Sequence, residues 1–246
     1  MISQARRSIL LVSLPLLFIG AAWAQESDRT PAAMARQKKQ DERLRNKMHF
    51  PGAKPIVTST INERGDLLTL DIMAGAIGPE EVLAAKPISL KALLGLRRSL
   101  TDLRLQGLPF THQSLSILSR FTALRTLTLD TCTHVKSFAP LGKLRKLKKL
   151  SLIAMPMIGF GALRKLKALV ELTLDRTGIE DLAPVAALPA LERLYLAESK
   201  VTELSPHQGI ATLKKVTVFG PLRATDEPTL AALKKRGVEI SDHRTP

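Results

Sequence analysis

The chain has 246 residues, of which 37 are Lys or Arg and 22 are Asp or Glu, so its formal net charge is +15 at pH 7. This length allows one domain with a substantial core. The chain contains a single cysteine, which excludes an intramolecular disulfide, so packing has to stabilise the fold.

The N-terminus has the order of a secretory signal peptide. Arg6 and Arg7 precede an uncharged apolar run over residues 9–20, and residues 22–24 form the Ala-x-Ala motif at which such peptides are cleaved. An uncleaved anchor is the alternative, but the run is shorter than the about 20 residues that a spanning helix needs. We therefore expect residues 1–24 to be removed, leaving an exported protein, periplasmic or secreted, without a membrane span.

Residues 25–50 are polar and rich in charge, and their few apolar residues are mostly small. Thr30 before Pro31 has the pattern of a helix start. Because so little apolar surface is available for burial, we expect a disordered or loosely helical linker.

The next segment, residues 51–99, is irregular. Its pattern predicts two strands around a turn at residues 62–66 and a short helix after Pro79. The alternative is a degenerate first repeat, whose apolar positions are Leu67, Leu70, Ile72 and Ile77. In both interpretations the segment caps the open N-terminal end of the core, as a solenoid requires.

From residue 100 onward the chain repeats itself. The leucine that opens each unit recurs every 22 to 24 residues, at Leu100, Leu124, Leu147, Leu169, Leu191 and Leu213. The fourth and sixth positions of each unit are also apolar and alternate with other residues, as in a strand with one buried face. One unit is too small to bury this face alone, so the units have to stack in parallel.

The C-terminal part of residues 100–246 is expected to close the stack. Extending the period by 22 residues from Val216 and Val218 predicts a last strand at Val238 and Ile240. A capped helix starting near Asp226 leads into it.

The pattern LxxLxLxx, with spaced leucines after it, resembles the leucine-rich-repeat family. The stretch GIEDLAPVAALPAL is similar to the short 22-residue class of bacterial internalin-type proteins. The resemblance covers about residues 96–241 and implies an α/β leucine-rich-repeat solenoid. Such a solenoid has a parallel β-sheet on its concave face and short helices or irregular turns on its convex face.

The ninth position of each unit departs from the family pattern, in which it is usually Asn. Here the position holds Leu108, Cys132, Met155, Thr177, Ser199 and Pro221. The Cys, Thr and Ser side chains can still make polar contacts, whereas the other three cannot. We therefore expect a broken polar ladder along the turns.

The sequence shows no catalytic motif: a nucleophile elbow, a phosphate-binding glycine loop and a zinc-binding HExxH are all missing. The five histidines are scattered, so we expect no catalytic residues, no metal and no cofactor. One local cluster consists of Asp130, Cys132 and His134. The favoured interpretation is an inward-pointing cysteine between two ordinary loop residues rather than a thiolate site.

Basic residues are concentrated just before the strands. Equivalent positions of a parallel solenoid stack about 4.8 Å apart, so residues four and two positions before the opening leucines share one edge. We call this set the basic rim: Arg120, Lys143, Arg145, Lys165 and Lys167. It is either a solvated surface that maintains solubility or a binding surface for an anionic partner.

The outward residues of the strands form a second candidate surface, and most of them are small or polar. Lys149, Glu171 and Arg193 alternate in sign at the third position of the repeat, which fits cross-strand pairing as well as recognition. Tyr195 and Phe219 lie on adjacent repeats and make a small apolar anchor. We call these five residues the concave-face candidates.

We interpret the chain as an exported, non-enzymatic binding or scaffolding protein, a monomer whose partner is a protein or an anionic envelope polymer. The alternative is a structural envelope component without a specific ligand. Aromatic residues make up 4% of the chain, and this scarcity, with the export signal, argues against base stacking and hence against nucleic acid.

Overall fold

The computed structural model describes residues 31–47, 56–61, 67–74, 89–110, 112–132, 135, 137–155, 159–201, 204, 210–219 and 227–242. The expected signal peptide and its cleavage site lie outside these residues. No helix in the described ranges is both long enough and apolar enough to cross a membrane.

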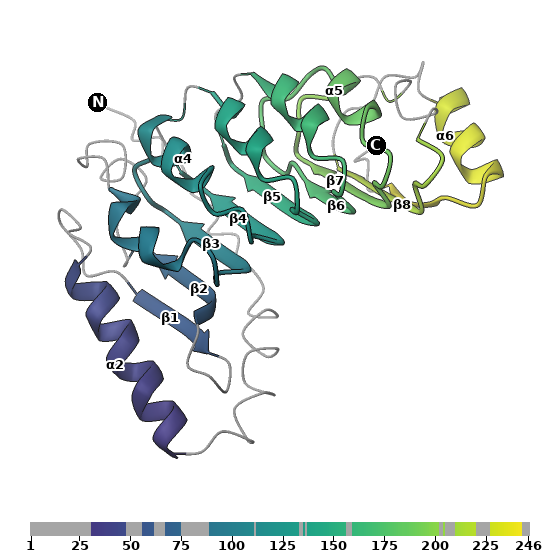
Figure 1. Ribbon diagram of the computed structural model, residues 1–246. Helices are drawn as coiled ribbons and strands as arrows, with labels where there is room; N and C mark the ends of the chain where they lie inside the picture. Colours follow the sequence, from purple (N-terminus) through teal and green to yellow (C-terminus); the bar gives the residue numbers. More distant parts are fainter. Residues whose placement is uncertain are drawn as a thin grey trace, which may run out of the picture.

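In the described part of the chain, nine strands form one curved sheet in sequence order (Figure 1). They are β1 (Ile56–Ile61), β2 (Leu67–Met73), β3 (Asp102–Gln106), β4 (Thr126–Asp130), β5 (Lys149–Ile153), β6 (Glu171–Thr173), β7 (Arg193–Ala197), β8 (Lys215–Phe219) and β9 (Glu239–Asp242). β1 runs antiparallel to β2, and each later neighbouring pair is parallel. The expected α/β solenoid with a parallel concave sheet is confirmed.

Short helices cover the convex side of the repeats (Figure 1). In chain order they are the 3₁₀-helix η2 (Leu90–Leu96), α4 (His112–Leu118), the 3₁₀-helices η3 (Ala139–Lys143) and η4 (Phe160–Lys165), α5 (Ala183–Ala186) and α6 (Glu227–Lys235). A longer helix, α2 (Pro31–Lys47), lies beside β1.

The predicted register is confirmed across the central repeats. Strand pairing places the fourth-position residues opposite one another, in the order Leu103, Leu127, Leu150, Leu172, Leu194 and Val216. Each of these side chains is at most 1% exposed. Every repeat therefore supplies part of the wall against which its neighbours pack.

The turn after each of the strands β3 to β7 contains a residue with a left-handed backbone conformation. These residues are Gly107, Thr131, Ala154, Arg176 and Glu198, with φ between 49° and 64°. Each donates its backbone N–H to a carbonyl of the next repeat, at 2.7 to 3.0 Å. The inter-repeat ladder therefore continues through the turn, although the conformation disfavours any residue except glycine.

We expect Gly107→Ala to lower the free energy of unfolding by about 1–2 kcal/mol, because L-residues are disfavoured at positive φ. The added Cβ would also lie 3.3 Å from the Cβ of Ala74. Urea denaturation measures this effect. The matched control is Gly95→Ala in η2, where a Cβ meets nothing within 4 Å; an equal loss in both variants would contradict the role of the turn.

The ninth-position residues make the partial polar ladder that the sequence predicted. Thr177 Oγ1 and Ser199 Oγ donate to the carbonyl three residues earlier, at 2.7 and 3.1 Å. Cys132 Sγ lies 3.5 Å from the carbonyl oxygen of Leu105 in the preceding repeat. Pro221 lies outside the described residues.

The structure agrees in part with each of the two sequence interpretations of residues 51–99. β1 and β2 form the expected antiparallel pair. β2 also runs parallel to β3, with Leu70 opposite Leu103 and Ile72 opposite Leu105, as a degenerate first repeat requires. The helix expected after Pro79 lies outside the described residues.

Within the expected linker, residues 31–47 form the helix α2, as one of the two alternatives predicted, but the helix is not loose, because it packs against β1. Leu44 is buried, Gln37 donates a side-chain hydrogen bond to the backbone carbonyl of Ser59, and the Ser59 hydroxyl donates to Asp41. Burial raises the pKa of Asp41. The docking is largely polar, which explains why apolar patterning did not predict it.

The predicted register of the last strand is wrong by two residues. Ile240 pairs with Val216, 24 positions earlier, and Val238 precedes β9. The nine-residue helix α6 replaces the shorter convex turns of the central repeats, so the chain needs two more residues to return to the sheet.

Candidate functional site

The basic rim is built from equivalent turns of successive repeats. Lys143 and Lys165 are the last residues of η3 and η4, and Arg120 comes two residues after α4. Arg145 and Lys167 lie in the turns that lead from these helices to the next strand. All five side chains are exposed, so none of them is committed to the core.

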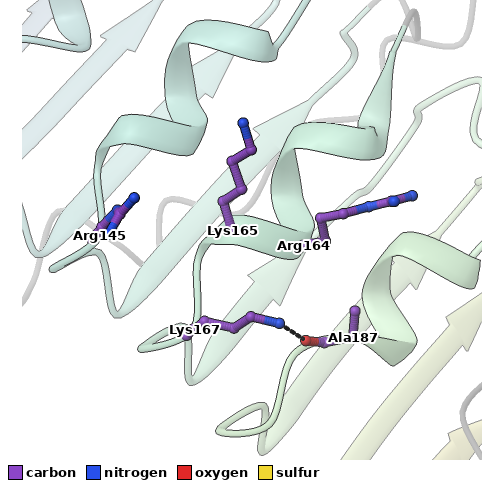
Figure 2. A pocket seen from close by; sticks show the side chains of 5 residues that line it. All are labelled: Arg145, Arg164, Lys165, Lys167 and Ala187. Atoms are coloured by element: carbon purple, nitrogen blue, oxygen red, sulfur yellow. Dashed lines mark hydrogen bonds between the residues drawn. The ribbon is translucent and has the colours of Figure 1, made fainter.

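The structure brings three of these residues together around one hollow of about 560 Å³. Figure 2 shows Arg145, Lys165 and Lys167 beside Arg164, with the backbone of Ala187 on the next repeat. The ammonium group of Lys167 donates to the carbonyl oxygen of Ala187 at 2.8 Å. Two arginines and two lysines therefore border the same hollow, although the Lys167 ammonium is turned toward Ala187 and Arg164 extends away from Arg145 and Lys165 (Figure 2).

Sequence reasoning missed Arg164. The equivalent residues of the two preceding units are Gly142 and Ser119, so no column of like charges marked this position. The signal that was available is its place next to Lys165, in the stretch between Asp130 and Glu171, which contains no other Asp or Glu.

The positive charge of the rim is not neutralised locally. Among the described residues, none of the five rim side chains lies within ion-pair distance of a carboxylate. The residues that line the hollow also include no Asp or Glu. The rim therefore keeps its full attraction for an external anion, within the limits of salt screening.

The concave-face charges are arranged differently, because they pair with one another across the strands. The Oε2 oxygen of Glu171 lies 3.7 Å from the Nζ of Lys149 and 2.8 Å from the Nε of Arg193. The hydrogen bond from Arg193 to Glu171 raises the pKa of the guanidinium. Cross-strand pairing therefore engages all three residues, with one carboxylate shared by two cations.

Tyr195 and Phe219 lie on neighbouring strands, but they are not directly opposite. Tyr195 pairs with Thr217, and Phe219 pairs with Ala197. Phe219 is 38% exposed and Tyr195 is half-buried. Their use as an apolar anchor stays a prediction.

At the N-terminal end of the concave face, Asp71 on β2 lies opposite Arg104 on β3. Burial raises the pKa of Asp71, and the charge of Arg104 opposes that rise. The sequence did not mark this pair, because β2 belongs to the irregular segment.

Cys132 points into the core, as expected. It is fully buried and free, and burial raises the pKa of its thiol to about 12. A thiol with this pKa stays protonated near neutral pH and is a poor nucleophile. Its neighbour Asp130 is also buried, while His134 lies outside the described residues.

Among the described residues, no group of three or more His, Cys, Asp or Glu is arranged to hold a metal ion. The sheet, the repeat register and the convex turns define the chain as a leucine-rich-repeat solenoid. No protein-family model matches the chain, and no curated protein matches it.

Solved structures with the same fold include two internalins from Listeria monocytogenes. Internalin C2 is 24% identical with a TM-score of 0.53, and the match covers 64% of this chain and 66% of that one. An internalin designated InlF is 21% identical with a TM-score of 0.52, over 73% of this chain and 50% of that one. The chain thus spans about two thirds of the first and half of the second. The likeness confirms the internalin-like leucine-rich-repeat fold.

Proposed function

We propose that the chain is an exported, non-enzymatic binding protein that recognises an anionic partner through its basic rim. The observation that carries this proposal is the row of exposed cations without a neighbouring carboxylate in the described part of the chain. The repeat supports it further, because it presents side chains in the same direction at each step and so produces an extended recognition surface. The partner is an anionic envelope polymer or an acidic protein.

The second candidate is a structural envelope component with no specific ligand. The paired charges of the concave face favour it, since they show that part of the charged surface serves the fold itself. A binding protein retains one partner at a saturable stoichiometry. A structural component sediments with envelope fragments without saturation.

The direct test is retention of an acidic polymer by the purified, immobilised protein, followed over increasing salt. Binding through the rim is expected to saturate and to weaken steeply as salt rises, because the screening length is about 8 Å in physiological conditions. Linear, unsaturated retention would support the structural alternative instead.

Export gives a separate prediction. The order of Arg6, Arg7, the apolar run and the Ala-x-Ala motif predicts that the mature protein begins at Gln25. N-terminal mass analysis of the exported product checks this. Recovery of Met1 on that product would contradict cleavage.

A further inference from the structure

The hollow described above differs from the rest of the rim because four cationic residues border it. Arg164 and Lys165 extend from η4, Arg145 comes from the turn after η3, and Lys167 from the turn after η4 (Figure 2). Elsewhere on the rim the cations are single residues of successive turns. This hollow is therefore the place where one anionic group can contact several cations at once.

Two of these side chains already contact the neighbouring repeats. The ammonium of Lys167 donates a hydrogen bond to Ala187. Lys165 crosses over Gly142 so closely that a Cβ on that glycine would lie 3.1 Å from the Cδ of the lysine. Pre-ordering lowers the conformational entropy that binding has to overcome.

The row of cations ends at the repeat that follows the hollow. One repeat further on, Ala187 and Pro189 occupy the positions of Lys165 and Lys167. Arg164 also lines a second hollow, together with Glu180 and Asp181. A polyanion is therefore attracted from the hollow toward the Arg120 end and repelled in the opposite direction.

The kind of anion follows from the donors. Two repeat steps separate Arg120 from Lys165, about 10 Å at the sheet, which favours a ligand with several charges in a row. Guanidinium groups bind phosphates and carboxylates alike through two parallel hydrogen bonds. The terminal phosphate of a chain has three non-bridging oxygens and a carboxylate has two, so the phosphate offers more acceptor sites to a group of several cations.

The surroundings do not favour a bilayer. The exposed large hydrophobic residues among those described are Met34, Ile56 and Phe219. None of these belongs to the rim or lines the hollow, so this edge offers no large apolar side chain for insertion between lipids.

The geometry points to a binding site for a linear phosphate polymer, whose chain runs along the basic rim and whose terminal bound phosphate sits among Arg145, Arg164, Lys165 and Lys167. This inference rests on the proposed function of the rim and specifies its ligand. It adds Arg164 as a contact residue and assigns Arg145 a stronger contact with a terminal phosphate than with a carboxylate.

The test compares the affinity of the purified protein for inorganic phosphate, for linear polyphosphate and for poly-glutamate with a matched number of charges. Polyphosphate is expected to bind at least about a hundredfold more tightly than inorganic phosphate, because one chain engages several repeats. Equal affinity for the two phosphates would mean an isolated ion site and would overturn the inference.

Two variants separate phosphate recognition from charge. Arg164→Gln is expected to weaken polyphosphate binding about tenfold, the effect of losing a charge-assisted contact. Arg145→Lys keeps the charge but loses the planar donor pair, which pairs with carboxylates as well as phosphates. It should therefore weaken binding of both polymers, and of polyphosphate more strongly, because a terminal phosphate offers more oxygens to the site. The control is Lys38→Gln on α2, which removes one exposed positive charge away from the rim.

The experiment distinguishes a failure of the phosphate inference from a failure of the proposed function. If Arg145→Lys weakens binding of both polymers equally, or affects neither, the inference of a phosphate ligand is overturned, while anion binding by the rim still stands. If Lys38→Gln weakens binding as much as Arg164→Gln, the attraction is due to net charge, and the proposed function fails as well. Equally tight binding to vesicles that contain anionic phospholipid would overturn the choice of a polymer over a membrane.

Discussion

Replacement of Leu172 by alanine is expected to lower the free energy of unfolding by about 2–5 kcal/mol. The side chain is 0% exposed and lies between Leu150 and Leu194 of the neighbouring repeats. Its removal leaves a cavity that touches three repeats at once. Because a solenoid is stabilised largely by contacts between neighbours, the loss falls on two interfaces.

Thr173→Ala is the matched control, since it changes the adjacent residue on the opposite face of β6. Thr173 is half-buried and points away from the core, so we expect a much smaller loss. Denaturant unfolding of both variants measures the difference as a shift in midpoint at constant slope. Similar losses would contradict the assignment of Leu172 to the core face.

The central repeats were predictable because their spacing is a geometric constraint. Parallel strands that bury one face have to align their apolar positions, so the period of leucines also fixes which residues pair. The pairing of Leu150 with Leu172 and of Leu172 with Leu194 follows from that period alone. Predicting the individual helices and strands added little to this prediction of the register.

The two ends were harder to predict because their chain paths are not periodic. α2 docks through the buried Leu44 and through polar contacts such as that of Gln37 with Ser59, and this combination leaves no hydrophobic pattern. At the other end, α6 adds two residues to the repeat. A fixed period of 22 therefore misplaces Val238 and Ile240, although it correctly predicts that a final strand exists.

The candidate site was predictable to the extent that it follows the repeat. Lys143 and Lys165 were found because they occupy the same position of successive units. Arg164 was missed because only one repeat carries a cation there. On the concave face, sequence could not decide whether Glu171 pairs or remains free, because side-chain conformation rather than register sets that contact.

The second prediction with a large effect concerns the rim. Reversal of Lys143 and Lys165 to Glu replaces two exposed cations, one repeat apart, with anions. If the rim binds an acidic polymer, the reversal should abolish binding, because each glutamate both removes an attraction and adds a repulsion along the same track. Retention on the polymer at low salt measures the loss.

The matched control is the reversal of Lys38 and Lys39 to Glu on α2, which changes the net charge by the same amount at two exposed positions. Thermal unfolding of both double variants should stay close to that of the unaltered protein, since neither lysine pair has a carboxylate partner in the described structure. With stability matched, loss of binding in the rim variant alone locates recognition at the rim. Equal loss in both variants would show that the polymer responds only to net charge, and the solvated-surface interpretation would then hold.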